Sequence, residues 1–568
     1  MTRHLASDLA DLEAAKSQYG PGCAAPVEKL LAAMRKGAFA DAESLIRFHD
    51  ALLFLRAFPQ SRNVVALTEE LLGGIEQQVM RLRDSGADMD LLDSEEFSGI
   101  AGTAIEDTLT YEVARWLALR HRREIGVAWE LDEQSRQMSS SLPQLLPLLG
   151  DDCFVEADTP YLEWLSQAAG GESRILPWLL QRLENAPLTI LQKAAWYDAL
   201  QIDISWELGN SSTASRTHAR RNPSKLYYHK APLLRRQQVS LPQELNSPPL
   251  PLRKLSPKQG EDILDFVREA LTVRYRELYG TTRGDPTQVI EADAGRGVHL
   301  FLWGLPPGRR LPLRAYHAGL TVKNGVPINY IEGISLCEWM EVGFNTFYAF
   351  RDGETAWIYS RVLHLLHQLT HVTCFSVYPY QLGEGNEEAI KSGAFWFYRK
   401  LGFRPGKPEL LAMTEKEEAR IAARPGYRTS ARVLRKLAAE HVFYEFGDET
   451  QGLWDSFATR NIGFAVQRLM AKKFKGNPEK MRRDTTASLA RILRVDPDNW
   501  SPLEQSSFAN FAPVLSLVPD LPRWTKIEQQ AVVQIVRAKV SPIEADYLRL
   551  LQRHPKLKEA LLRLGWQA

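Results

Sequence analysis

A run of strand-like segments between residues 298 and 350 interrupts a chain whose other parts repeat apolar residues at helical spacing. The segments are VHLFLWGL, AYHAGLTV, VPINYIEGISL and MEVGFNTFYAF, which have the composition and apolar patterning of strands. Asn324 and Gly325 separate two of them, and Asn-Gly readily adopts the two positive φ angles of a type I′ hairpin. The sequence therefore predicts an antiparallel meander, followed by a helix in WIYSRVLHLLHQL, a strand in HVTCFSVYPY and a helix in AIKSGAFWFYRKL.

Helical periodicity dominates on both sides of this region. Apolar residues recur every three or four positions up to about Leu208, and they do so again after Gly447. A chain of 568 residues has the length of about three or four domains. We therefore expect an α+β multidomain protein with a helical domain over residues 1–240, a central α/β domain over 241–447 and a helical domain over 448–568. The central sheet should be mixed and mostly antiparallel.

Charge and cysteine content argue against several classes of protein. The 70 Lys and Arg balance 69 Asp and Glu, so the chain lacks the positive excess of a dedicated nucleic-acid coat. No apolar stretch approaches the ~20 residues that cross a bilayer, and the N-terminus has no secretory pattern. We expect neither a membrane nor a nucleic acid as a partner. Four widely spaced cysteines indicate reduced thiols in a cytoplasmic protein, not a zinc ribbon or a disulfide framework: Cys23, Cys153, Cys337 and Cys374.

Two further patterns bear on catalysis. Signatures of P-loop nucleotide hydrolysis, of the commonest serine hydrolases and of zincin proteases do not occur in the chain. His364, His367 and His371 lie at i, i+3 and i+7 and share one face of a predicted helix. No carboxylate or cysteine accompanies them at ligand spacing, so we interpret them as a solvated polar face and expect no metal site.

A basic stretch separates the first helical region from the centre. Residues 209–243 contain no acidic residue and many cations, among them Arg216, Arg220, Arg221 and Lys225. Charge runs usually serve solubility, which favours a solvated connector or basic linker. The alternative is a phosphate-binding strap in which Tyr227 and Tyr228 stack on a base.

The segment from Asn386-Glu387-Glu388-Ala389-Ile390 to Tyr398-Arg399-Lys400-Leu401-Gly402-Phe403 resembles the closing signature of the GNAT superfamily of acyl-CoA-dependent N-acyltransferases. In that family an Asn precedes a helix that ends in Tyr, a polar pair and Gly-Phe. The resemblance covers at most a third of the chain. It implies a GNAT-like central domain that uses acetyl-CoA or another acyl-CoA, with Asn386 contacting the pantetheine.

The resemblance also implies a cofactor loop. In the family this loop and the following helix N-terminus receive the pyrophosphate of coenzyme A, because unpaired N–H groups and the helix dipole favour an anion. The match is degenerate, since glycine arrives one place early and a glutamate stands in its position. The edge of the preceding strand should contact the pantetheine near Phe347 to Phe350. The implied cofactor-binding residues are Phe350, Arg351, Asp352, Gly353, Glu354, Thr355 and Ala356.

Three residues are candidates for the chemistry. Tyr398 matches the tyrosine that protonates the departing thiolate in many family members, and its alternative role is simple core packing. A general base must take a proton from the attacking amine. Glu332 and Glu341 lie on strands where the family often places such a group, and nothing in the sequence ranks them.

Two functions follow from these patterns. The first is transfer of an acyl group from acyl-CoA to an amine of a small molecule or protein. The second is a non-catalytic scaffold with a degenerate acyltransferase-like core, whose helical flanks bind a protein partner. An open gap between the parted strands reaching Tyr398 would favour the enzyme, and a gap filled by Trp357, Trp396 or a flanking helix would favour the scaffold.

Overall fold

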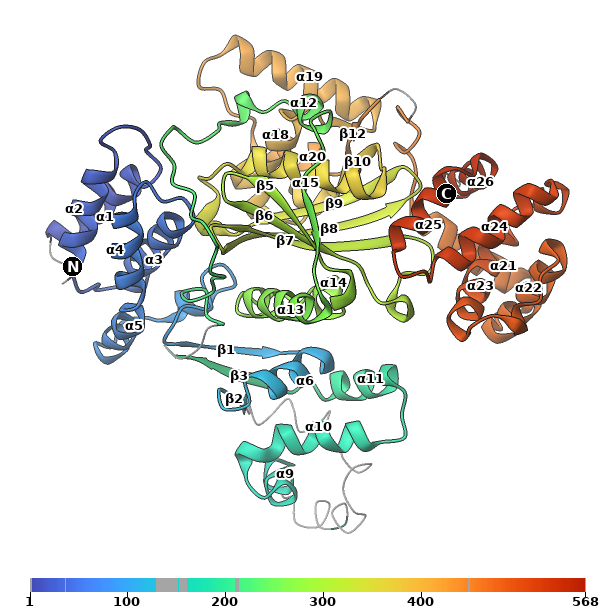
Figure 1. The fold of residues 1–568 in the computed structure, drawn as a ribbon, viewed down its shortest axis with the longest axis horizontal. Coiled ribbons are helices and arrows are strands. Elements are labelled where there is room, and N and C mark those ends of the chain that lie inside the picture. Colours follow the sequence, from blue (N-terminus) through green and yellow to red (C-terminus); the bar gives the residue numbers. More distant parts are fainter. Residues whose placement is uncertain are drawn as a thin grey trace. The chain divides into compact units, whose positions relative to one another are not determined.

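The computed structural model describes residues 3–35, 37–128, 152, 161–209, 214–447 and 450–566 (Figure 1). The chain forms two compact units. The first consists of Met1–Pro232, Asp265–Thr282 and Asn324–Pro327, and the second of Leu233–Leu264, Arg283–Lys323 and Ile328–Ala568. Two short excursions of the later chain therefore belong to the first unit.

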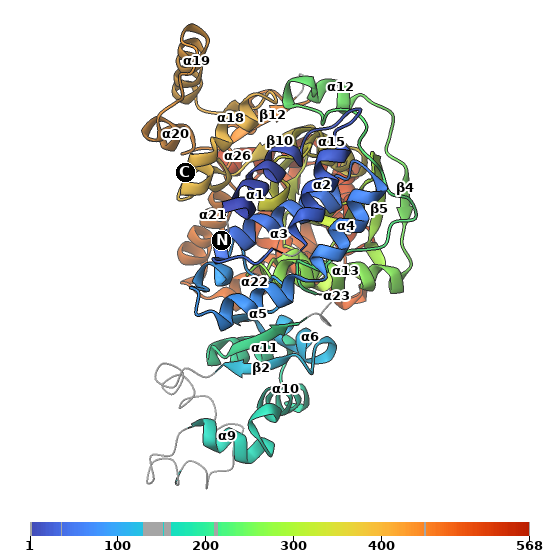
Figure 2. The same ribbon diagram turned by 90° about the vertical axis from the view of Figure 1, so that its left-hand side faces the viewer.

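The first unit begins with a helical bundle. Its helices are α1 (Arg3–Ala15), α2 (Ala24–Met34), α3 (Ala42–Ala57), α4 (Arg62–Leu72) and α5 (Ile75–Asp84). Helix α3 is buried on nearly all sides, and α1 and α4 pack against it (Figure 2). Asp41 and Ser61 begin α3 and α4 by accepting hydrogen bonds from the N–H groups of Ser44 and Val64. The helical N-terminal region expected from the sequence is confirmed over these residues.

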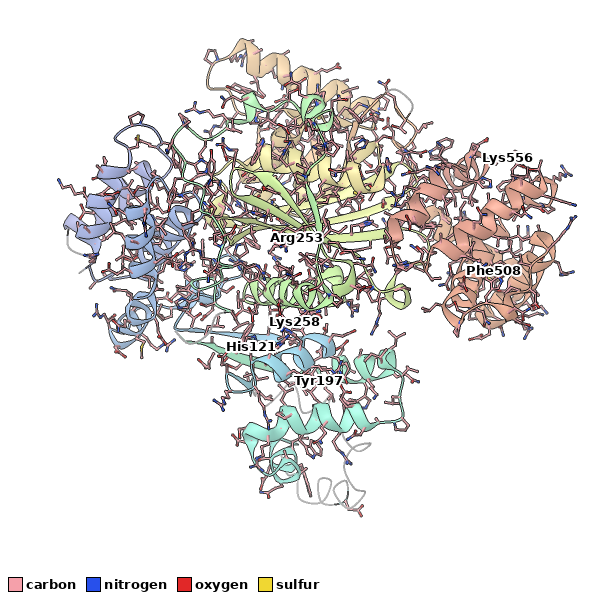
Figure 3. The ribbon with its side chains drawn as sticks, in the orientation of Figure 1. His121, Tyr197, Arg253, Lys258, Phe508 and Lys556 are labelled. Carbon is pink, nitrogen blue, oxygen red and sulfur yellow. The ribbon has the colours of Figure 1, made fainter. Side chains whose placement is uncertain are left out.

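A three-stranded antiparallel sheet follows in the same unit, where the sequence predicted only helices. Its strands β1 (Thr103–Thr108), β2 (Ile125–Ala128) and β3 (Asp203–Leu208) are ordered β1-β3-β2. The helices of this part are α6 (Tyr111–Arg120), α9 (Tyr161–Ala169), α10 (Ile175–Asn185) and α11 (Ile190–Leu200). The ring of His121, labelled in Figure 3, packs at a tilt against Trp206, and its two nitrogens lie 3.1 Å from carboxylate oxygens of Glu124 and Glu269. The strands are too short to stand out from the helical pattern around them.

The described residues of the basic stretch up to Pro232 belong to the first unit, and residues 233–243 belong to the second. Arg216 is buried and donates to the carbonyl oxygen of Glu96 at 3.0 Å, and Arg220 pairs with Glu69. The backbone N–H of Tyr227 donates to Asn324 at 2.8 Å. Arg216 and Arg220 are therefore packed within the first unit by carbonyl and carboxylate partners, whereas Lys225 and Lys230 are exposed, as a solvated connector predicts.

The second unit contains a nine-stranded sheet within the described residues, in the order β11-β12-β10-β9-β8-β7-β6-β5-β4. Asn324 and Gly325 have φ angles of 50° and 83°, which confirms the predicted hairpin between β7 and β8. The sheet is mixed and mostly antiparallel as expected, because β9 and β10 run parallel. Its strands are β4 (Leu252–Lys254), β5 (Ile290–Gly295), β6 (Val298–Trp303), β7 (Ala315–Lys323), β8 (Val326–Leu336), β9 (Trp339–Thr346), β10 (Cys374–Val377), β11 (Arg404–Pro405) and β12 (Val442–Glu445).

Helix α15 (Thr355–Thr370) packs on one face of this sheet, where Tyr359 meets Phe344 of β9 at a ring separation of 4.8 Å (Figure 1). Shorter helices follow β10 along the chain. The remaining helices around the sheet are α12 (Leu241–Leu245), α16 (Pro379–Leu382), α17 (Glu387–Ser392), α18 (Ala394–Arg399), α19 (Pro408–Ala423) and α20 (Ala431–Leu437). Helices α13 (Pro257–Thr272) and α14 (Tyr279–Thr282) lead into β5, and α13 spans both units.

The segment 233–250 runs along the whole of α15. It bonds the helix at its start through the Leu234 N–H and near its end through Gln368, which exchanges two hydrogen bonds with Leu250. Between these points His364 is buried against Ser247, with Nδ1 and Oγ 3.2 Å apart. The histidine-bearing face is therefore covered by protein over part of its length, and the expectation of a solvated face was wrong for His364.

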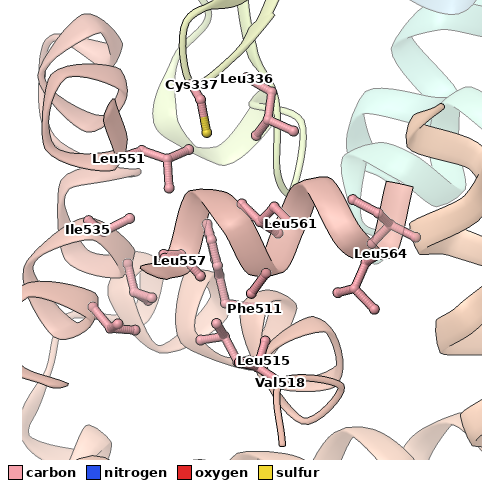
Figure 4. Packing of buried hydrophobic residues seen from close by; sticks show 14 of the residues in the cluster. Leu336, Cys337, Phe511, Leu515, Val518, Ile535, Leu551, Leu557, Leu561 and Leu564 are labelled. Atoms are coloured by element: carbon pink, nitrogen blue, oxygen red, sulfur yellow. The ribbon is translucent and has the colours of Figure 1, made fainter. Parts of the chain in front are cut away.

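Six helices form the C-terminal part of the second unit and share a core with one end of the sheet. Leu336 and Cys337, at the turn between β8 and β9, lie against Leu551, Leu557 and Leu561 (Figure 4). The expected C-terminal helical region is confirmed, and its core continues into the sheet. These helices are α21 (Thr459–Phe474), α22 (Pro478–Leu493), α23 (Pro502–Leu515), α24 (Lys526–Ala538), α25 (Glu544–Gln552) and α26 (Pro555–Trp566).

Candidate functional site

Strands β9 and β10 part in the middle of the sheet. Their parallel pairing ends at Glu341 and Ser376, while β9 continues for five residues to Thr346. The side chain of Gln381, from α16, bridges the gap that opens. Its Oε1 accepts from the backbone N–H of Phe344 at 3.5 Å and lies 3.3 Å from the hydroxyl of Tyr398.

Tyr398 is buried at this point, with 5% of its surface exposed. Its ring makes edge contacts with Tyr359 and Phe403, at centroid separations of 5.7 and 5.8 Å. Burial raises the pKa of Tyr398 above its ordinary value, because the charged phenolate is poorly solvated there. Tyr398 is thus a neutral phenol that donates a hydrogen bond to Gln381 at the strand gap, and its ring is part of the aromatic core.

Gly343 marks a close approach inside β9. A Cβ atom there would lie 3.1 Å from Nε2 of Gln381 and 3.5 Å from Cβ of Glu332, which faces Gly343 across the β8–β9 ladder. Glycine within a strand often indicates that another group comes near the backbone. Gly343 therefore leaves room between Glu332 and Gln381 on the sheet face opposite α15.

The two candidate bases differ in their surroundings. Glu332 accepts from the hydroxyl of Tyr316, and burial raises the pKa of its carboxyl group. Glu341 instead faces His441, with Oε2 and Nε2 2.8 Å apart, and both side chains keep some exposure to solvent. Both carboxylates lie on the sheet face that carries Gly343, as the β8–β9 register requires.

The loop before α15 is tightly held. The N–H of Gly353 donates to the carbonyl of Phe350 at 3.0 Å, and the hydroxyl of Thr355 donates to the carbonyl of Arg351 at 3.4 Å. Phe350 and Ala356 are buried and Asp352 is exposed. Residues 348–350 form a 3₁₀ turn and the Phe347 N–H bonds β8, so this stretch is not the strand edge that the resemblance implied.

Arg351 stands at the surface of this loop. Its guanidinium pairs with Glu388 and lies 5.0 Å from the ring centre of Tyr348. The side chain is 40% exposed, so a ligand phosphate could reach it in competition with Glu388. Arg351 is therefore the accessible cation of the implied cofactor loop.

Glu354 occupies the position where the resemblance implies glycine, and it points into the protein. The carboxylate is fully buried, forms a two-point ion pair with Arg296 and accepts from the N–H of Leu234 at 2.9 Å. Lys323 lies in the same cluster, where burial lowers its pKa to about 7. The charge of Glu354 is thus compensated by Arg296, and the structure gives this residue an internal anchoring role rather than a ligand contact.

Asn386 caps a helix. Its side chain accepts from the N–H of Ala389 at 3.1 Å and so begins α17. Gly393, with φ of 70°, then ends α17 and separates it from α18, the helix that carries Tyr398. The structure engages the Asn386 side chain in its own helix, where the resemblance implied a pantetheine contact.

Gln381, Gly343 and His441 were not singled out from the sequence. Gly343 and His441 owe their places to strand register, and Gln381 owes its place to α16. No local sequence pattern indicates any of the three. Neither tryptophan considered from the sequence enters the gap. Trp357 stacks near Arg296 and Arg361, and Trp396 donates to Thr429 at 3.1 Å.

The described ranges lack both a cluster of metal-ligating side chains and a long apolar helix. No group of three or more His, Cys, Asp or Glu side chains there could hold a metal ion. None of the described helices combines the length and apolar character needed to cross a membrane. Cys23, Cys337 and Cys374 are free thiols, and Cys153 lies outside the described residues.

Similarity to known proteins gives no guide to the site. No family model matches the chain, and no curated protein or solved structure matches it. The geometry around the parted strands is therefore the basis for a functional assignment.

Proposed function

We propose that the second unit contains a GNAT-type domain that transfers an acyl group from acyl-CoA to an amine. The observation that carries this proposal is the parting of the parallel strands β9 and β10 with the Tyr398 hydroxyl beside the gap. The strand order β8-β9-β10-β12-β11, the helix between β9 and β10 and the closing motif all agree with that family.

The donor would lie in the gap. Its pantetheine amides can pair with the edge of β9, where Gln381 now accepts from the Phe344 N–H. A bound acyl-CoA would replace this side-chain amide with one of its own, so the exchange loses little hydrogen bonding. Its pyrophosphate would approach the start of α15 and Arg351, because both favour an anion.

The internal pairing of Glu354 supports this placement. A free carboxylate beside a pyrophosphate would repel it, and the sequence alone left that conflict open. Arg296 neutralises Glu354 inside the protein, so the glutamate in the glycine position does not by itself exclude an anion. Asp352 is exposed to solvent, which screens its charge.

The reaction would be a direct transfer. The amine nitrogen attacks the thioester carbon, a C–N bond forms and the C–S bond breaks. Tyr398 donates its proton to the departing CoA sulfur and is reprotonated from solvent. The proton lost by the amine passes to an acidic side chain on β8 or β9, Glu332 or Glu341, or to a neighbouring group.

A non-catalytic scaffold is the second candidate, and the contacts of three side chains favour it. Gln381 already fills the hydrogen-bonding position at the Phe344 N–H, and Asn386 and Glu354 have structural partners. In that case the helical flanks would carry the function by binding a protein. The two candidates differ in whether acyl-CoA displaces Gln381.

A titration with acetyl-CoA separates them. Ligand at about 100 times its dissociation constant should add about 2.7 kcal/mol to the stability of the full chain, seen as a raised melting temperature. By calorimetry, Arg351→Ala should weaken binding about tenfold or more. Arg483→Ala, on the exposed surface of α22, is the matched control and should leave affinity unchanged. An unchanged melting temperature at millimolar acetyl-CoA and at millimolar longer acyl-CoAs would contradict the proposed acyltransferase function.

A further inference from the structure

The face of β9 opposite α15 changes character along the strand. Trp339 is buried, with its ring stacked on Trp454 of the C-terminal part at 5.5 Å. The next residues on that face are Glu341, Gly343 and Asn345. The apolar cover from the C-terminal part therefore gives way to a polar row, and Glu341 is its first member.

Glu341 holds His441, the residue immediately before β12 begins. The Glu341 Oε2 to His441 Nε2 separation is 2.8 Å, and the two side chains are 21% and 27% exposed. With a carboxylate on Nε2, the neutral imidazole carries its proton there and its lone pair on Nδ1. This is the arrangement in which a carboxylate fixes the tautomer of a histidine base.

Tyr378 connects this pair to the strand gap. Its ring meets His441 edge-on at 5.5 Å, and its carbonyl accepts from the N–H of Gln381 at 3.0 Å. Gln381 in turn contacts Tyr398, the proposed proton donor to the thiolate. His441 thus lies next to the segment that carries Gln381, on the sheet face away from α15.

We propose that the acceptor is a primary amine that arrives as its ammonium cation, and that His441, positioned by Glu341, takes one proton from it to free the nitrogen lone pair for attack. The second proton leaves the nitrogen for solvent as the C–N bond forms, while Tyr398 protonates the departing thiolate. This inference rests on the proposed acyltransferase function. Two carboxylates, Glu332 and Glu341, lie on the face that the amine would approach. The half-exposed rings of Tyr378 and Tyr380 offer aromatic surface to a cation beside them.

Other charged groups surround the pair and shape its pH dependence. Arg314 lies close enough to Glu341 to interact electrostatically, and it counters part of that carboxylate's charge. Glu440, next to His441 in the chain, is paired with Lys407. Tyr378 is the titratable neighbour from α16. None of these replaces Glu341 as the partner of Nε2.

The test measures thiol release from acetyl-CoA with benzylamine, spermidine and a lysine peptide as acceptors, across pH 5 to 9. His441→Gln should lower turnover about 10²-fold or more, the usual contribution of a general base. It should also flatten the dependence of the rate on pH, because the ionisable base is removed. Acetyl-CoA affinity, measured by calorimetry, should stay within twofold of the parent chain.

Two further variants sharpen the result. Glu341→Gln should reduce turnover while keeping a dependence of the rate on pH, because the base is present but poorly oriented. His371→Gln, at the exposed C-terminal end of α15, is the control and should have no effect. Equal melting temperatures of the variants would show that folding is intact.

The outcomes separate the two proposals. If the parent chain binds acetyl-CoA and acylates an amine while His441→Gln keeps its rate and pH profile, this inference fails and the acyltransferase stands. If reaction occurs only with neutral aromatic amines such as aniline, the cationic acceptor is wrong. If the parent chain does not bind acetyl-CoA, the proposed function itself fails.

Discussion

The loop before α15 and the outer face of β9 use their charged residues in opposite ways. In the loop, residues that a family motif would assign to a ligand have internal partners: Glu354 binds Arg296, Arg351 pairs with Glu388 and, further on, Asn386 caps α17. On β9 the polar residues lie beside a strand gap, and neither Glu341 nor Gly343 belongs to a motif. A degenerate motif therefore does not indicate where the chemical groups of the domain lie.

Substitution of Glu354 should have the largest effect on stability, because its carboxylate is buried and paired. The size of the effect distinguishes an anchoring role from a ligand-binding role. Glu354→Ala leaves the Arg296 guanidinium without its buried partner, and breaking such a pair typically costs about 3–5 kcal/mol. Urea unfolding of the full chain measures the loss. The surface residue Arg351 provides the contrast, since Arg351→Ala should cost only about 0–1 kcal/mol. Similar losses in the two variants would contradict the contrast drawn between the loop residues.

Tyr398→Phe should have the next largest effect, on turnover. Removing the proton donor to the thiolate should slow acyl transfer about 10²-fold, which corresponds to about 2.7 kcal/mol in the barrier. Acetyl-CoA affinity should change little, because only the hydroxyl is lost and the ring stays in the aromatic core. A variant with full turnover would leave Tyr398 with a packing role alone.

The pH dependence of stability tests the buried cluster behind the loop. Burial lowers the pKa of Lys323 to about 7 in the folded chain, whereas an unfolded lysine titrates near its ordinary value. Between these values the unfolded chain binds more protons, so this group makes stability rise with pH by up to about 1.4 kcal/mol per unit. Lys323→Met should remove that component between about pH 7 and 10. If the free energy of unfolding of the parent chain and of Lys323→Met changed with pH in parallel, the lowered pKa of a buried Lys323 would be refuted.

Gly343→Ala should have the smallest effect on the free energies considered. It adds one methyl group directly beside the gap between β9 and β10. The new methyl group would press on the Gln381 amide at 3.1 Å and narrow the space beside Glu332. We expect acetyl-CoA affinity or turnover to fall about tenfold, or about 1.4 kcal/mol. Gly463→Ala in α21 is the matched control, because nothing lies within 4 Å of its added methyl group. It should stabilise that helix by up to about 1 kcal/mol and leave the site unaffected.

Much of the fold could be read from the sequence because its signals are local. The Asn324–Gly325 turn, the strand run after residue 298 and the helical repeats each depend on neighbours a few positions apart. The sheet of β1, β2 and β3 was missed because its strands are short and come from distant parts of the first unit. Arg216 appeared to belong to a solvated linker, and only its packed environment shows that it is buried.

The candidate site was less predictable because several of its contacts join residues that are far apart in the chain. Tyr398, Glu332 and Glu341 were named in advance because the motif and the strand pattern place them. Gln381 comes from α16, and its position depends on where β10 stops. His441 comes from the residue before β12, and its position is fixed by the sheet register. Their partners lie 37 and 100 residues away in the chain, so no spacing pattern could reveal them.

Hydrogen–deuterium exchange of the full chain with and without acetyl-CoA tests the central claim most directly. If acyl-CoA takes the place of Gln381 between β9 and β10, backbone amides of residues 342–346, residues 378–382 and the first turn of α15 should become protected together. Amides of α21 to α26 away from the sheet should not change. Binding without protection of residues 342–346, or protection confined to the helical flanks, would contradict a donor site at the parted strands.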